Sequence, residues 1–316
     1  MKRLGIFCLA LLLLVPMPAC SRPIAASSVG FACDTVVTVT VYASQTEADN
    51  AIELCKSYER LFSKTIEGSD IWNLNHAEGK PVRVDPETIA LLELAVEIGK
   101  ASNGAFDVTI APVSALWDFT ADDPKVPAES ELEQALTLVD YRSIRIEDDT
   151  VTLLNGCQLD LGGIAKGYIA DCVAAYLKQR GVEHACINMG GNIVVFGGKP
   201  DGKPWTIGIR DPNGTPDQSE ETVTLNDGVL VTSGNYERFF ILDGKRYHHI
   251  LDPKSGMPVQ NGLASVTILA DSSAVADALS TACFVLGEEA AAALLAEYHA
   301  DAIFLYQDGT RSSCSS

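Results

Sequence analysis

The chain has 316 residues, 47% of them hydrophobic, which is enough to bury a large core in one or two domains. Its 42 acidic residues outnumber 23 basic ones, so the formal net charge is -19 at pH 7. This surplus argues against a nucleic-acid binder and a basic membrane-surface patch, and it restricts any anionic ligand to a local site with its own cations.

The first twenty residues have the pattern of an export signal. Two basic residues precede an apolar run over residues 4–15, which is shorter than the about 20 residues of a membrane-spanning helix. A small residue then precedes Cys20, as in a bacterial lipoprotein signal; cleavage without a lipid is the alternative. We expect residues 1–20 to be a lipoprotein signal peptide and residues 21–30 a tether. The mature protein would then be extracytoplasmic and anchored to the cell membrane through Cys20.

The nine cysteines predict neither disulfides nor a zinc site. Beyond Cys8 and Cys20, seven remain, an odd number without a C-x-x-C pair. Cys55, Cys172 and Cys283 lie on the apolar faces of predicted helices, where a free thiol packs as a small hydrophobic group. We therefore expect mostly buried thiols.

The first half of the mature chain mixes strands and helices. Val37, Val39 and Val41 alternate with other residues, which predicts a strand. Apolar residues at helical spacing begin at Ala51, and again after Asp85-Pro86, a pair suited to a helix start. The expected elements are a strand over 35–42, a helix over 51–61, a polar loop over 70–75, a helix from 86 to about 101, a surface loop over 118–128, and strands over 143–146 and 151–154.

Two glycines and a lysine precede a predicted helix in the middle of the chain. The stretch is Asp160-Leu161-Gly162-Gly163-Ile164-Ala165-Lys166-Gly167, after which apolar residues recur at helical spacing as far as Gly181. Free N–H groups at the helix start and the charge of Lys166 favour a phosphate, while the glycines allow its close approach. The stretch is not a Walker A loop, and an ordinary loop-to-helix junction is an equal alternative at this point.

The second half predicts an antiparallel sheet followed by helices. Strand-like runs near 185–189, 193–196, 205–209, 221–225, 228–232, 238–242 and 246–250 are separated by turn residues. A strand over 262–269, helices over 272–286 and 288–298, and a strand over 302–306 complete the chain. Because no regular βαβ order appears, the predicted class is α+β, with mixed or antiparallel sheets and packed helices.

One face of the helix over 272–286 is a candidate cation site. Asp277 and Thr281 are four residues apart, opposite the apolar stripe, and could present two oxygens to one ion. Hard oxygen donors suit Mg²⁺, with water and substrate phosphate as its further ligands. A solvated helix face with incidental polar residues is the alternative, and is favoured when the pair is considered alone.

The adjacent His248 and His249 do not predict a metal site. On a strand their side chains point to opposite faces, so one histidine would pack or position and the other could act as a general base. In the loop Gly104-Ala105-Phe106-Asp107, the ring and the carboxylate could grip a ligand ring and a ribose hydroxyl. Such a phenylalanine more often fills the core.

Five motifs in this order resemble the ApbE family of FAD:protein FMN transferases from about residue 31 to residue 306. They are the Gly104–Asp107 run, the Asp160–Gly167 run, Thr232-Ser233-Gly234-Asn235-Tyr236, His249-Ile250-Leu251-Asp252-Pro253 and Ala276-Asp277-Ala278-Leu279-Ser280-Thr281. Each motif is weak alone, but five in order are specific. The chain departs from the family at Cys33-Asp34-Thr35, where members often have Met-Gly-Thr.

The resemblance implies one domain over residues 31–310, a two-lobed α+β fold with a central FAD cleft. It implies Mg²⁺-dependent transfer of FMN from FAD to a Thr or Ser hydroxyl of an acceptor flavoprotein subunit in a membrane or extracytoplasmic redox system, with release of AMP. The implied base is His249, and the implied metal ligands are Gly163, Asp277 and Thr281. The implied FAD contacts are Cys33, Trp72, Ala105, Phe106, Asp107, Asp160, Lys166 and Leu251.

Two other activities fit the same residues. Water could replace the acceptor hydroxyl, which would make the protein a Mg²⁺-dependent FAD pyrophosphatase. Alternatively, the protein could be a non-catalytic lipoprotein that binds FAD. For the transferase we expect activity to fall at low pH, as the His249 imidazole becomes protonated.

Overall fold

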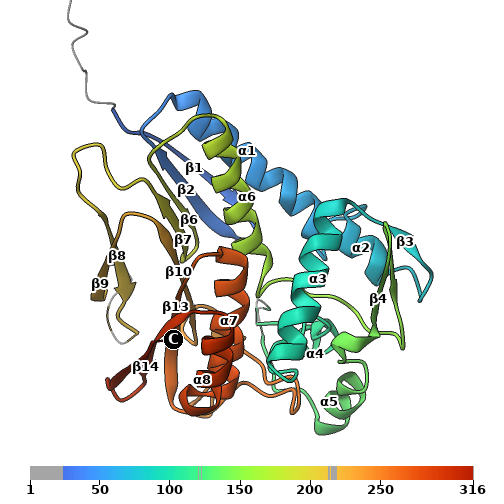
Figure 1. Cartoon of the computed structure of the whole chain (residues 1–316). Helices are drawn as coiled ribbons and strands as arrows, with labels where there is room; N and C mark the ends of the chain where they lie inside the picture. Colours follow the sequence, from blue (N-terminus) through green and yellow to red (C-terminus); the bar gives the residue numbers. More distant parts are fainter. Residues whose placement is uncertain (1–23, 120, 122, 213, 215–218, 316) are drawn as a thin grey trace, which may run out of the picture.

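The structure is a computed structural model, which describes residues 24–119, 121, 123–212, 214 and 219–315. It has two lobes that lie side by side, one built on a large sheet and one mostly helical (Figure 1). A single buried apolar cluster extends through both lobes, so they share one core. The predicted signal peptide and Cys20 lie outside the described residues.

The larger lobe is built on an eight-stranded sheet in which every neighbouring pair is antiparallel. This pairing confirms the predicted α+β class, because parallel neighbours with helical crossovers would be needed for an α/β fold. In sheet order the strands are β1 (Ala26–Ala32), β2 (Thr35–Val41), β6 (Ala185–Met189), β7 (Asn192–Phe196), β10 (Gly228–Gly234), β13 (Leu263–Ala270), β14 (Asp301–Tyr306) and β15 (Arg311–Cys314).

Helices cover one face of this sheet and a β-ribbon covers part of the other. The helices are α1 (Gln45–Phe62), α6 (Ala165–Gln179), α7 (Ser273–Leu286) and α8 (Glu288–Glu297), seen in front of the sheet in Figure 1. The ribbon of β8 (Trp205–Arg210) and β9 (Ser219–Leu225) forms a second, smaller apolar cluster with the sheet. Both faces of the central strands are therefore buried, which explains their nearly continuous apolar sequence.

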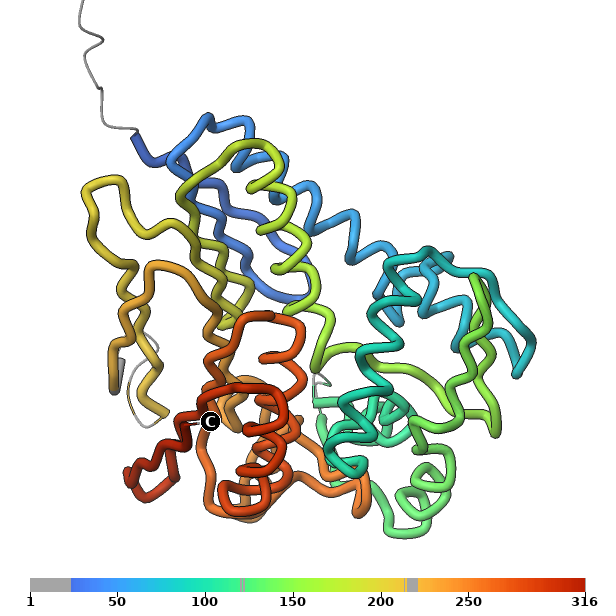
Figure 2. Tube along the Cα trace, in the orientation of Figure 1, coloured from blue at the N-terminus to red at the C-terminus, as the bar shows by residue number. Residues whose placement is uncertain are grey.

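The smaller lobe surrounds a three-stranded sheet in the order β3-β5-β4. Its elements are α2 (Asp70–Asn75), β3 (Val82–Arg83), α3 (Pro86–Ala101), α4 (Ala111–Trp117), α5 (Glu129–Leu136), the 3₁₀ turn η1 (Tyr141–Ser143), β4 (Ile144–Glu147) and β5 (Thr150–Leu153). The hairpin of β11 (Phe239–Leu242) and β12 (Lys245–His248) forms a sheet of its own. The segment that follows it, orange in Figure 2, returns to this lobe, where Trp117 Nε1 donates to the Gly256 carbonyl at 2.8 Å.

Several predicted boundaries are wrong. Residues 26–30, predicted as tether, belong to β1, and β15 lies beyond the predicted domain end at residue 310. The predicted polar loop over 70–75 is helix α2, whose first turn is capped by the Ser69 hydroxyl. Helices α4 and α5 were not predicted; each is only about two turns long, too short for a clear apolar period.

The expectation of mostly buried thiols is met only in part, because three of the seven described cysteines are buried and four are partly exposed. All seven cysteines in this part of the chain are free. Cys55 and Cys283 are fully buried, whereas Cys172 is only partly covered. In the described part of the chain, no helix combines the length and the apolar character required to cross a bilayer.

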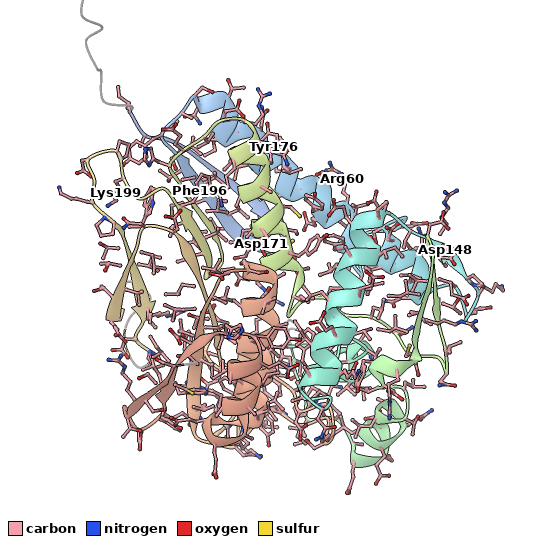
Figure 3. The ribbon with its side chains drawn as sticks, in the orientation of Figure 1. Arg60, Asp148, Asp171, Tyr176, Phe196 and Lys199 are labelled. Carbon is pink, nitrogen blue, oxygen red and sulfur yellow. The ribbon has the colours of Figure 1, made fainter. Side chains whose placement is uncertain are left out.

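Helices α6 and α7 cross in close contact at Gly167. A Cβ atom on Gly167 would overlap the Ser273 carbonyl oxygen and lie 2.8 Å from Asp277 Cβ. One turn further along α6, Asp171 caps α7, because its carboxylate accepts from the Ser273 and Ala274 N–H groups and from the Ser272 hydroxyl. Figure 3 shows Asp171 on α6, beside the start of α7. Absence of a side chain at residue 167 thus sets the distance between the two helices.

Replacement of Gly167 by alanine should destabilise the protein despite the higher helix propensity of alanine. Propensity alone would favour Gly167→Ala by about 1 kcal/mol, but overpacking against α7 costs about 1–3 kcal/mol or more. Urea unfolding should therefore show a lower free energy of unfolding. As a control, Ala175→Gly at an exposed position of the same helix measures the effect of helix propensity on stability without a packing change. A stabilised Gly167→Ala variant would show that the helices are free to separate.

Candidate active site

The start of α6 brings Lys166 beside an acidic residue of α7. Lys166 Nζ lies 2.9 Å from the Gly162 carbonyl oxygen, to which it donates, and 3.6 Å from Asp277 Oδ2. The Lys166 side chain is 23% exposed, whereas that of Asp277 is 4% exposed. The cation therefore stays accessible to a ligand while its protein counter-ion is buried.

Asp277 is buried in the helix crossing, so the alternative interpretation of a solvated helix face is wrong. Its Oδ2 atom accepts a hydrogen bond from the Gly167 N–H at 2.9 Å. The first turn of α6 thus binds a carboxylate of the protein itself, which satisfies part of its anion-binding capacity. Asp277 Oδ1 accepts no hydrogen bond from the described residues and is the oxygen available to a cation.

Thr281 and Gly163 meet next to Asp277, as expected for the predicted metal site. The Thr281 hydroxyl lies 3.4 Å from the position a Cβ atom would take on Gly163. One carboxylate, one hydroxyl and a nearby backbone carbonyl are hard donors that fit Mg²⁺, which keeps several waters or phosphate oxygens in its shell. No group of three His, Cys, Asp or Glu side chains gathers among the described residues, so a site rich in nitrogen or sulfur donors does not form there.

Ser233, which was given no role of its own, joins these residues from the end of β10. Its hydroxyl lies 2.7 Å from the Ser280 hydroxyl and 3.5 Å from Thr281 Oγ1. Ser280 is fully buried and donates to the Asp277 carbonyl oxygen at 2.8 Å. The chain of hydroxyls restricts the rotamer of Thr281. Only its place in the Thr232–Tyr236 motif marked Ser233 in the sequence.

Cys33 lies in the turn between β1 and β2, close to the same site. Cys33 and Asp34 have φ angles of 53° and 56°, the left-handed geometry of a two-residue hairpin turn. The Cys33 N–H donates to Glu59 Oε1 at 2.8 Å. Burial and the charge of Glu59 raise the pKa of the Cys33 thiol to about 12, although nearby Lys166 opposes the shift. The thiol is therefore neutral and suited to apolar contact with a ligand.

Asp160 is paired with a lysine that sequence analysis missed. Lys64 Nζ lies 2.6 Å from Asp160 Oδ2, the Ser114 hydroxyl donates to the same oxygen at 3.1 Å, and the Gly162 N–H donates to Oδ1 at 3.0 Å. Burial would raise the pKa of Asp160, but the Lys64 ammonium and these donors hold it below its usual value. Lys64 follows α1 without any local pattern, so only its position in space reveals the ion pair.

The Ala105-Phe106-Asp107 run is buried, and Phe106 fills the core. The Phe106 ring lies 3.2 Å from the position that a Cβ atom would take on Gly163, so it packs against the turn that precedes α6. The Asp107 carboxylate accepts from the N–H and hydroxyl of Thr109 and from the Tyr141 N–H. Burial nevertheless raises the pKa of Asp107. These side chains hold the conformation of the loop. The sequence predicted only a contact of Asp107 with a ribose hydroxyl and did not indicate this structural role.

Trp72 and Leu251 lie in the helical lobe. Trp72 is half-buried on α2, and its ring stacks on His76 with centroids 4.0 Å apart. Leu251 is 7% exposed and packs in a cluster with Val113 and Trp117 of α4. Their predicted contacts with FAD stay predictions, as does the cleft itself. Two hollows at the surface, of about 480 and 320 Å³, are lined by other residues.

The two adjacent histidines have different surroundings. His248 is 1% exposed, with Nε2 2.8 Å from the Val259 carbonyl oxygen and its ring edge against Phe284 of α7. It packs in the core, so His248→Ala should leave a cavity. His249 has a buried Nδ1 atom without a hydrogen-bond partner among the described residues.

Burial, and then the positive charge of Arg238, lowers the pKa of His249 to about 3; Lys166 acts in the same direction. The imidazole is therefore neutral near pH 7 in the free protein. The expected loss of activity at low pH stays a prediction, and the low pKa of His249 moves it to a lower pH than an ordinary imidazole would give. A neutral imidazole near Lys166 is in the correct state to accept a proton.

Comparison with known proteins identifies the family. The model of the ApbE family matches residues 33–304. The chain belongs to this family. A relative named FAD:protein FMN transferase from Treponema pallidum is 38% identical over 298 residues, covering 87% of this chain and 82% of the relative. One of the same name from Klebsiella pneumoniae is 38% identical over 263 residues, covering 82% and 81%.

Solved ApbE structures share the fold. The ApbE protein of Thermotoga maritima superposes with a TM-score of 0.85 at 35% identity, covering 92% of this chain and 97% of that one. The apo flavinyl transferase ApbE of Pseudomonas stutzeri gives 0.83 at 29% identity, covering 93% and 95%. These likenesses confirm the predicted family and fold class.

Asp277 both accepts a structural hydrogen bond and is a proposed metal ligand, so its replacement by alanine and by asparagine should have different effects. Asp277→Ala leaves the buried Gly167 N–H without an acceptor, which costs about 1–3 kcal/mol of unfolding free energy. Asp277→Asn keeps an acceptor oxygen and should fold with nearly parent stability, yet lose Mg²⁺-dependent turnover of FAD. Thermal unfolding and turnover at limiting Mg²⁺ test both variants. Parent turnover by the asparagine variant would exclude Asp277 as a ligand, and equal stability of the two would exclude the structural role.

Proposed function

We propose that this chain is a FAD:protein FMN transferase that joins FMN to a Thr or Ser hydroxyl of an acceptor flavoprotein and releases AMP. The observation that carries the proposal is the meeting of Lys166, Asp277, Thr281 and Gly163 where α6 begins. A pyrophosphate needs local cations in a chain of net charge -19, and this position supplies them. The names of the family relatives support the same reaction.

The proposed metal is Mg²⁺, held by Asp277, Thr281 and the Gly163 carbonyl. When bound, Mg²⁺ supplies positive charge to the phosphate oxygens. Lys166 binds the same region from the α6 side and stabilises negative charge that develops on the leaving AMP. Asp277 keeps its geometry because Gly167 holds one of its oxygens.

The transfer requires one bond exchange and one proton transfer. The acceptor oxygen attacks the phosphorus on the FMN side of the pyrophosphate, the P–O bond to AMP breaks, and the hydroxyl proton goes to His249. Because a hydroxyl is a far weaker acid than imidazolium, the proton leaves as the new bond forms. Lys166 is one of the cations that lower the pKa of His249. A phosphate group that pairs with Lys166 offsets this effect and makes His249 a stronger base.

Turnover with and without an acceptor separates this proposal from its alternatives. Purified protein is incubated with FAD and Mg²⁺, and AMP, free FMN and protein-bound flavin are measured. The proposal expects bound flavin and AMP in equal amounts when acceptor is present. Fast release of free FMN and AMP without acceptor would identify a pyrophosphatase, and FAD binding without turnover would identify a carrier.

His249 should contribute to transfer rather than to FAD affinity. A general base contributes about 10²–10⁴-fold, so His249→Ala should lose single-turnover transfer on that scale and keep its affinity for FAD. Since the free-protein pKa is about 3, the parent kcat/KM should not fall between pH 7 and pH 5 through this group. FAD titration and pH profiles of both proteins provide the measurement. Similar losses of rate and affinity, or a parent profile that falls near pH 6 and flattens in the variant, would exclude this role.

We also propose that the mature protein is attached to the extracytoplasmic membrane surface by lipidated Cys20. The support is the sequence pattern that ends at Cys20. Stable attachment needs more than one acyl chain, which a lipoprotein modification provides. Parent protein should sediment with membranes and Cys20→Ser should not. A soluble parent protein, or a fully membrane-bound variant, would exclude the anchor.

A further inference from the structure

The β11–β12 hairpin exposes apolar side chains next to the candidate active site. Ile241 is 62% exposed, Leu242 42% and Phe239 37%. Within the described residues, β11 and β12 pair only with each other, so each strand has a free edge. Free strand edges with apolar side chains are surfaces on which an extended peptide can add as a further strand.

An aromatic cluster fixes the other face of the hairpin against the helical lobe. The Phe240 and Tyr247 rings stack with centroids 5.3 Å apart, and Trp117 of α4 lies 6.3 Å from Phe240 and 5.6 Å from Tyr247. Phe119 lies 5.8 Å from Phe240. The hairpin is thus held in place through one face only, while Phe239 and Ile241 occupy the other.

The same hairpin carries cations without acidic partners. Neither Lys245 nor Arg246 has a carboxylate within 4.0 Å among the described residues, although the chain contains 42 acidic residues. Aromatic rings hold both cations instead. The Arg246 guanidinium lies 4.4 Å from the Phe239 centroid and 3.1 Å from Asn235 Oδ1, and Lys245 Nζ lies 5.1 Å from the Tyr247 centroid. Two ordered, unpaired cations fit a partner that brings its own carboxylates.

The hairpin leads directly into the proposed base. His249 follows β12, and its N–H donates to the Arg238 carbonyl oxygen at 3.0 Å at the start of β11. At about 3.4 Å per residue, Arg246 lies within about 10 Å of His249 along the strand. A hydroxyl that reaches His249 therefore belongs to a segment that passes close to the hairpin.

We propose that the β11–β12 hairpin is the docking surface for the acceptor protein. The acceptor presents an extended segment in which carboxylates and an apolar side chain flank the Thr or Ser. Arg246 lies on the face of Phe239 and Ile241, and Lys245 on the face of Tyr247. Successive carboxylates of an extended segment added at the hairpin edge also alternate between faces, so they pair with Arg246 and Lys245 while an apolar side chain packs on Ile241 and the hydroxyl enters beside His249. The inference rests on the proposed transferase function and specifies the chemistry of its protein substrate. A membrane surface is the less favoured partner, since anionic lipid would repel a chain of net charge -19.

Charge reversal at Lys245 and Arg246 tests the docking surface. The probe is the membrane fraction of the organism that encodes the chain, incubated with full-length protein, FAD and Mg²⁺, and covalent flavin is read as fluorescence on a denaturing gel. The double variant Lys245→Glu/Arg246→Glu should label at least about tenfold more slowly at low salt, with FAD affinity and acceptor-free turnover unchanged. The parent rate should fall toward that of the variant near 0.5 M salt, where exposed charges are screened.

A second double variant controls for net charge. Arg60→Glu/Lys100→Glu changes the charge by the same amount at two exposed cations on α1 and α3, and Figure 3 shows Arg60 on the outer side of α1. It should label like the parent. Ile241→Ser tests the apolar contact without a charge change and should slow labelling about threefold to tenfold, in keeping with one exposed aliphatic side chain. Thermal unfolding of each variant verifies that the hairpin variants are folded.

Four results would overturn the inference. The first two are unchanged labelling by the Lys245→Glu/Arg246→Glu variant and an equal loss of labelling in the control variant. The third is weaker FAD binding that accounts for the loss of labelling. The fourth is binding to phosphatidylglycerol vesicles that depends on Lys245 and Arg246 while labelling does not. If the parent labels no protein while it consumes FAD, the transferase function itself fails, and the docking surface fails with it.

Discussion

The crossing of α6 and α7 determines whether the proposed site exists. Gly163 and Gly167 belong to one helix start, and Asp277 and Thr281 belong to a helix more than a hundred residues later in the chain. These groups come together only because the two helices pack at a short distance. That separation is short because residue 167 has no side chain, and it is fixed by the hydrogen bond from the Gly167 N–H to Asp277. The contact between Gly167 and Asp277 therefore both packs the two helices and positions the proposed metal ligand.

The electrostatics of the site follow from its position in an acidic protein. Lys64 is neutralised by Asp160, and Lys166 is opposed by a carboxylate that already accepts from a backbone N–H. Lys166 is thus left with capacity to bind an anion, whereas Lys64 holds the turn that precedes α6. Burial, and then the charges of Arg238 and Lys166, lower the pKa of His249 and keep its imidazole unprotonated. A site arranged to bind pyrophosphate therefore also prepares a neutral base.

Sequence periodicity predicted the elements better than their surroundings. Asp277 and Thr281 lie four residues apart on α7, as the predicted helix required, but the face opposite the apolar stripe proved to be buried against α6 rather than solvated. A helix packed between a sheet and another helix buries almost its whole circumference, and one apolar stripe does not reveal the second contact. Phe106 filled the core, as a lone phenylalanine usually does. Lys64 could not be predicted, because nothing local relates it to Asp160, 96 residues away.

The five short motifs acquire their specificity in space. The Phe106 ring and the Thr281 side chain both lie close to Gly163, and Ser233 contacts Thr281 from β10. Four of the motifs thus contribute atoms around one glycine, where an added side chain would meet two of them at once. The His249 motif is related to this centre by the charge of Lys166. Each motif alone is compatible with many folds, whereas their joint packing around Gly163 requires this sheet order and this helix crossing, which explains why their order along the chain is informative.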